Sequence, residues 1–143
     1  MNSIKNILIL CTGNSCRSQI AHGWLSYFTG NTANIYSAGI ETHGVNPKAI
    51  ATMAEEGIDM NQHTSNLVDE YQGIDFDFII TVCDHAAENC PVIPSKNAVR
   101  IHHNFSDPSK LNGTEEAIKT AFRATREEIK LFCEDFVRVN LAQ

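Results

Sequence analysis

Cys11-Thr12-Gly13-Asn14-Ser15-Cys16-Arg17-Ser18 stands between an apolar stretch at residues 7–10 and a helix-compatible stretch at residues 19–25. The order strand, loop, helix, with small residues between a cysteine and an arginine, predicts a loop whose backbone N–H groups surround a tetrahedral oxyanion. The positive end of the helix and the Arg17 guanidinium would stabilise a thiolate at Cys11. The same guanidinium can hold two oxygens of phosphate, arsenate or a similar anion. The stretch therefore predicts nucleophilic attack by sulfur.

Other residues of the loop have expected supporting roles. We expect Ser18 to donate a hydrogen bond to the Cys11 thiolate and Asn14 to brace the loop with its side-chain amide; helix capping and turn formation are the structural alternatives. Cys16 is either a second thiol that protects Cys11 or a small filler, and filler is favoured. The residues expected to bind the oxyanion are Thr12, Gly13, Asn14, Ser15, Cys16, Arg17 and Ser18.

Composition limits the class of protein. A chain of 143 residues, 43% apolar and 20% charged, fits one globular domain over residues 1–143. A net charge of −6 argues against a nucleic-acid partner, which would need a basic face. Apolar runs are far shorter than the roughly 20 residues of a membrane helix, and an odd count of five cysteines indicates reduced thiols in a cytoplasmic protein. We expect a monomer.

Short strand-like and longer helix-like segments alternate along the chain. Strands are expected at residues 5–10, 35–38, 76–83 and 98–102, and helices at 15–28, 47–56, 64–68 and 114–139. This alternation predicts an α/β three-layer sandwich, a four-stranded parallel sheet with helices on both faces. The second helix should bury Ile50, Met53 and Ala54. The last helix should bury Ala117, Ile118, Ala121, Phe122, Ile129, Phe132, Cys133 and Phe136.

Two further cysteines could act with Cys11. If the first and third strands are neighbours, Cys83 reaches the same sheet edge as Cys11, close enough for a disulfide. Cys90 lies seven residues further on, about 10.5 Å along a helix, so Cys83 and Cys90 could join only if that segment unwinds. The combination predicts a redox-driven conformational switch. The alternatives are inert thiols, or zinc ligands together with His85, His102 or His103.

Asp107-Pro108 follows the fourth strand and should approach the same edge of the sheet. A carboxylic acid there could protonate a leaving oxygen while Cys11 attacks. An Asp-Pro pair is also commonly a simple turn. We favour the acid role, because an oxyanion held nearby needs such a donor.

Four stretches together resemble the thioredoxin-coupled arsenate reductases of the low-molecular-weight phosphatase superfamily: residues 11–19, 36–47, 83–91 and 107–108. The resemblance implies that Cys11 attacks arsenate, that Cys83 attacks the adduct to release arsenite, and that thioredoxin reduces a Cys83–Cys90 disulfide. Phosphate or sulfate would compete as oxyanions, and neither a cofactor nor a metal is expected. Some relatives hold potassium with acidic side chains where this chain has His22 and Asn66. We therefore expect His22 to be a helix surface residue.

Two other functions stay open at this stage. A plain phosphotyrosine phosphatase would need only Cys11, Arg17 and Asp107, although such enzymes usually carry aromatic residues after the Asp-Pro pair. A non-catalytic thiol module that binds arsenite or zinc would leave Arg17 beside Cys11 without a purpose. The sequence also leaves open whether thioredoxin or a glutaredoxin-type donor is the reductant.

Overall fold

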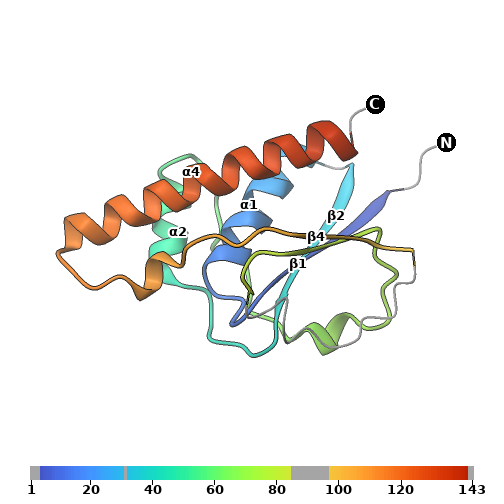
Figure 1. Cartoon of the computed structure of the whole chain (residues 1–143), viewed down its shortest axis with the longest axis horizontal. Coiled ribbons are helices and arrows are strands. Elements are labelled where there is room, and N and C mark those ends of the chain that lie inside the picture. The colour runs from blue at the N-terminus through green and yellow to red at the C-terminus, as the bar shows by residue number, and fades with distance from the viewer. Residues whose placement is uncertain (1–3, 31, 85–96, 142–143) are drawn as a thin grey trace.

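The structure is a computed structural model that describes residues 4–30, 32–84 and 97–141. Its centre is a four-stranded, wholly parallel sheet with the strand order β2-β1-β3-β4 (Figure 1). The strands are β1 (Lys5–Cys11), β2 (Ala33–Gly39), β3 (Phe78–Thr81) and β4 (Val99–His102). The expected parallel α/β sheet is therefore confirmed, with a longer second strand and a shorter third strand than the sequence suggested.

Helices cover both faces of this sheet unequally. Within the described residues the helical elements are α1 (Arg17–Thr29), α2 (Pro47–Ala54), α4 (Glu115–Asn140) and two short 3₁₀ helices, η1 (Val68–Tyr71) and η2 (Pro108–Lys110). The three α-helices lie together on one face, and η1 lies on the other, where Tyr71 packs edge-on against Tyr36 of β2 (Figure 1). The three-layer arrangement is as expected.

The buried centre of the sheet explains why it positions one site so firmly. Residues 7–10 of β1 are at most 1% exposed, because β1 has a neighbouring strand on each side and helices above. Registry places Cys11 beside Gly39 and Leu10 beside Thr81. All four strands run the same way, so their carboxyl ends meet at one edge, where ligands bind in open α/β sheets.

The prediction of a short helix at residues 64–68 is wrong. The helical turn begins only at Val68, Leu67 is extended, and residues 64–66 have no regular secondary structure. Their backbone groups are used elsewhere, since the carbonyl of Asn66 accepts from the N–H of Gly39 at 2.8 Å and Leu67 forms a parallel bridge with Gly39. A segment that supplies its hydrogen bonds to a strand end cannot also close a helix.

The buried faces of two helices differ from expectation. In α2 the buried residues are Ala49, Thr52 and Met53, while Ile50 is half-buried and Ala54 is exposed. The core face of α2 is therefore turned by one position, toward α4.

In α4 the expected Phe122, Ile129, Cys133 and Phe136 are buried, but Ala117 is exposed because the first turn of the helix projects beyond the core. Arg126 is buried instead, which the apolar pattern did not predict.

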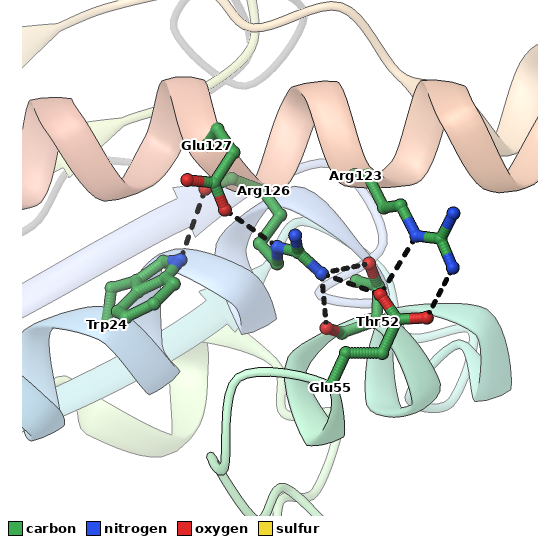
Figure 2. A network of polar contacts seen from close by, with 6 residues as sticks. All are labelled: Trp24, Thr52, Glu55, Arg123, Arg126 and Glu127. Carbon is green, nitrogen blue, oxygen red and sulfur yellow. Dashed lines mark hydrogen bonds and ion pairs between the residues drawn. The ribbon is translucent and has the colours of Figure 1, made fainter.

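Arg126 joins α4 to α2 and α1 (Figure 2). Its Nη1 donates to the carbonyl of Thr52 at 2.9 Å and to Oε1 of Glu55 at 2.8 Å. Arg123 donates to the same Glu55 carboxylate from two nitrogens. The Arg126 carbonyl accepts from Trp24 Nε1 at 3.2 Å. A buried guanidinium is tolerated here because its charge is paired with Glu55 and Glu127 and its Nε and Nη1 are hydrogen-bonded.

Candidate active site

The loop between β1 and α1 is held open by the backbone and side chain of Asn14. Asn14 has a φ of 48°, a left-handed conformation that asparagine tolerates better than other residues with a side chain. Its buried amide donates to Ser18 Oγ at 2.8 Å, and its Oδ1 accepts from the N–H of Asn66 at 2.7 Å. Asn14 thus braces the loop against both α1 and the segment beyond α2, as its residue type predicted.

Cys11 ends β1 with its side chain in this loop, and it is 4% exposed. Its pKa is held well below the usual value for a thiol, first by a hydrogen bond with the Cys83 side chain, against the opposing effect of burial. Hydrogen bonds from the side chain and backbone of Ser18 and the charge of Arg17 lower the pKa further. The geometry favours a thiolate at Cys11.

Cys83 lies two residues beyond β3 and is 2% exposed. Its Sγ lies 3.4 Å from Oγ1 of Thr12, and its side chain is hydrogen-bonded to Cys11. The neighbouring strands β1 and β3 therefore bring the two thiols together at one sheet edge. Sequence reasoning placed them near each other but did not foresee that Cys83 is the main stabiliser of the Cys11 thiolate.

Cys16 has the opposite character. It is also 4% exposed, but burial, together with the negative groups nearby, raises the pKa of its thiol. It makes no side-chain capping bond at the start of α1. A buried, protonated thiol at this position behaves as a small apolar side chain, which supports the interpretation of Cys16 as filler.

Arg17 and Asp107 meet across the mouth of the loop. One guanidinium nitrogen of Arg17 donates to the carbonyl of Phe105 at 2.8 Å, and another lies 3.5 Å from Asp107 Oδ2. Asp107 also caps η2, since its Oδ1 accepts from the N–H of Ser109 at 3.0 Å and from its hydroxyl at 2.6 Å. Asp107 therefore does take part in a turn, and its second carboxylate oxygen, Oδ2, is still directed toward the arginine.

A pocket of about 490 Å³ opens above these groups. Four of its lining residues were not singled out in the sequence: Glu41, His43, Ser109 and Lys110. Residues 41–46 follow the loop closely, with the N–H groups of Glu41 and His43 donating to the carbonyls of Thr12 and Gly13. A Cβ at Gly13 would collide with the exposed His43 ring, so a larger residue there would force that ring to move. Residues 41–46 form one wall of the pocket, and in the sequence only the family resemblance of residues 36–47 pointed to it.

His22 is not the surface residue that was expected. Its ring is half-buried, with Nδ1 2.8 Å from Ser37 Oγ and the ring centroid 4.4 Å from that of His63. Burial, assisted by His63, lowers the pKa of His22 to about 4, so the imidazole is neutral near pH 7. The face of α1 that carries His22 is directed toward β2, and no apolar pattern in the sequence marked that face.

Cys90 and His85 lie outside the described residues, so the switch expected around them stays a prediction. In the parts of the chain that the structure describes, Cys11, Cys16 and Cys133 are free thiols. Within those same parts no group of three or more His, Cys, Asp or Glu side chains is arranged to hold a metal ion. Over the described ranges no helix is long and apolar enough to cross a membrane.

The sequence profile of the low molecular weight phosphotyrosine protein phosphatases matches residues 6–142. The chain belongs to this family. It is 49% identical over 125 residues to an arsenate reductase of Halalkalibacterium halodurans, covering 87% of this chain and 89% of the relative. It is 47% identical over 132 residues to an arsenate reductase of Staphylococcus aureus strain N315, covering 92% and 95%.

Among solved structures, an arsenate reductase in the phosphate-binding state matches with a TM-score of 0.77 and 27% identity, covering 94% of this chain and 97% of the other. The resemblance to arsenate reductases of the low-molecular-weight phosphatase superfamily, inferred from the four sequence stretches, is thereby confirmed, while the coupling to thioredoxin stays a prediction.

Proposed function

We propose that this protein is an arsenate reductase that converts arsenate to arsenite in arsenic detoxification. The observation that carries the proposal is the hydrogen-bonded pair of Cys11 and Cys83 beside a pocket that is lined by Arg17 and can admit an oxyanion. A phosphatase needs one nucleophilic thiol, whereas two-electron reduction needs a second sulfur within reach of the first. The arsenate reductases that match over most of their length support the same assignment.

In the first step the Cys11 thiolate attacks arsenic. An S–As bond forms and an As–O bond breaks, and the oxygen leaves as water after protonation by Asp107. Arg17 and the N–H groups of residues 12–18 hold the other oxygens and offset their negative charge. Asp107 lines the pocket, and its Oδ2 lies 3.5 Å from Arg17, within reach of a bound oxyanion.

In the second step Cys83, once it has given its proton to solvent, attacks the sulfur of Cys11. An S–S bond forms, and the electron pair of the S–As bond stays on arsenic, which leaves as arsenite. Cys90 then attacks Cys83, forming a Cys83–Cys90 disulfide and freeing the Cys11 thiolate. A dithiol protein of the thioredoxin type reduces that disulfide and becomes oxidised itself.

The surroundings of the enzyme follow from this chemistry. Free thiols must survive between turnovers, which fits a reducing cytoplasm. Phosphate and sulfate compete with arsenate for the same pocket, because they share its shape and charge. We propose a monomer of one domain that needs no cofactor, since the chain itself supplies both electrons.

The test couples arsenate reduction to thioredoxin, thioredoxin reductase and NADPH, and compares it with hydrolysis of an aryl phosphate by the same preparation. We expect NADPH oxidation that depends on arsenate in the wild type and its loss in Cys83→Ser. A wild-type protein that hydrolyses the aryl phosphate but oxidises no NADPH with arsenate would contradict the proposal.

Phosphatase activity is the second candidate function. It is favoured by the family and by the Arg17–Asp107 pair at the pocket, which suffices for phosphoryl transfer through a cysteinyl phosphate. We expect it as a weak side activity. The mouth of the pocket is lined by Glu41, His43 and Lys110, and its lining among the described residues includes no Phe, Tyr or Trp to stack on an aryl substrate.

A further inference from the structure

His102 at the end of β4 bridges two residues on either side of Cys83. Its Nδ1 lies 2.7 Å from the hydroxyl of Thr81, and its Nε2 lies 2.6 Å from Oδ1 of Asp84. The three side chains Thr81, His102 and Asp84, here called the His102 bridge, enclose the two residues Val82 and Cys83. One imidazole thus ties both ends of the segment that presents the second thiol.

The backbone reinforces this bridge. The N–H of Asp84 donates to Oδ1 of Asn104 at 3.1 Å, and the N–H of Phe105 donates to the carbonyl of Val82 at 3.1 Å. β3 itself ends at Thr81, so these contacts continue strand-like pairing past the end of the regular strand. The residue that follows Cys83 is therefore fixed through both its backbone and its side chain.

A single neutral tautomer satisfies both contacts of the imidazole. Nε2–H donates to the Asp84 carboxylate, and Nδ1 accepts from the Thr81 hydroxyl. The His102 and Asp84 side chains are 40% and 67% exposed, and exposed pairs of this kind contribute little to global stability. What the bridge supplies is orientation, because breaking either contact leaves the chain next to Cys83 held by its backbone hydrogen bonds and no longer by its side chains.

We propose that His102 is a positioning residue for the reduction step, which aims Cys83 at Cys11 by bridging Thr81 and Asp84. The inference rests on the proposed function. Cys83 Sγ lies 3.4 Å from Thr12 Oγ1 and is hydrogen-bonded to Cys11, an arrangement that a small rotation of residue 83 would break. Misplacement of a reacting group by about 1 Å can cost about 10²-fold in rate.

The test removes the bridge from its exposed end with Asp84→Ala and uses Asp135→Ala as the matched control. Asp135 pairs with Arg138 on α4, and its side chain is 64% exposed, so the control also deletes an exposed, paired carboxylate. Asp84→Asn keeps an acceptor for Nε2–H and should retain most of the wild-type behaviour. His102→Ala is the second variant that breaks the bridge.

Two quantities are measured on each purified full-length variant. The first is the pH dependence of thiolate absorbance in the ultraviolet, which reports the ionisation of Cys11 without arsenate. The second is the rate of arsenite release in a single turnover. Asp84→Ala and His102→Ala should raise the pKa of Cys11 and slow arsenite release by about ten- to hundredfold, while Asp135→Ala changes neither.

Asp84→Ala or His102→Ala that matches Asp135→Ala in either quantity would overturn the positioning role. If the wild type releases no arsenite at all, the proposed function fails. The thiolate titration then still decides whether the bridge orients Cys83, because it needs no substrate.

Discussion

The two cysteines of the loop, Cys11 and Cys16, are equally buried, since each is 4% exposed. The pKa values of their thiols are nevertheless shifted in opposite directions. At Cys16 the loss of water, together with the negative charges of Asp107 and Cys11, raises the pKa of the thiol. Burial also acts to raise the pKa of Cys11. Hydrogen bonds from Cys83 and Ser18, together with the charge of Arg17, outweigh that effect, and the pKa falls. Burial in the loop is therefore not enough to make a nucleophile, because the pKa of a thiol falls only where Cys83, Ser18 and Arg17 act on it together.

The largest effect is expected from Cys11→Ser. Serine cannot provide a thiolate, so arsenate reduction and aryl phosphate hydrolysis should both fall by about 10⁴-fold or more. Steady-state assays of both activities on one preparation check this. A Cys11→Ser protein that still reduces arsenate would remove Cys11 from the mechanism.

Substitutions of Cys83 sharpen the comparison, because they change the donor and leave the nucleophile. Cys83→Ser and Cys83→Ala should both abolish multiple-turnover arsenate reduction, since neither can form the S–S bond. Only Cys83→Ala removes the hydrogen-bond donor as well, so it should raise the pKa of Cys11 further than Cys83→Ser does. Aryl phosphate hydrolysis should persist in both, with the low-pH limb of the alanine variant moved to higher pH. Equal titration curves for wild type and Cys83→Ala would show that Cys83 does not stabilise the thiolate.

Asp107→Asn should lower both activities by about 10²-fold, a typical effect of removing a general acid. The asparagine keeps an oxygen that can cap η2, so the fold is preserved. The pH dependence of kcat separates the roles, because loss of the acid should remove the high-pH limb of the profile. An unchanged profile would favour the turn alternative for Asp107.

Cys16→Ala tests the other half of the comparison. A thiol that serves only as filler can become a methyl group with kcat/KM close to wild type and a small loss of thermal stability. Steady-state kinetics together with thermal unfolding check this. Loss of activity as large as that of Cys11→Ser would show that the two cysteines are not distinct.

The sequence predicted the parallel sheet, the loop and the meeting of residues 11 and 83, because each follows from local pattern plus strand topology. It missed contacts that depend on tertiary packing. The apolar pattern of α4 could not predict that Arg126 is buried, because its burial depends on contacts with Thr52 and Glu55 outside that helix. His22 was misplaced for the same reason, because its partner Ser37 lies on β2.

The smallest effect is expected at Glu55. This residue takes no part in the chemistry of the two thiols, so it tests the stability of the scaffold separately. Hydrogen bonds from Arg123 and Arg126 lower its pKa to about 2. A lowered pKa in the folded state stabilises the protein above the ordinary glutamate pKa, and that contribution is lost as the pH falls toward about 2. Thermal unfolding should therefore show Glu55→Gln slightly less stable than wild type at pH 7, with a difference that shrinks in acid. A difference that grows in acid would contradict the assignment.

The most direct test of the account is to map the disulfide left after one turnover with arsenate and no reductant. Free thiols are alkylated, and the peptides are identified by mass. The account predicts one arsenite per chain and a disulfide joining Cys83 to Cys90, with Cys16 and Cys133 alkylated. Arsenate left unreduced with every cysteine alkylated, or a disulfide that omits Cys83, would contradict it.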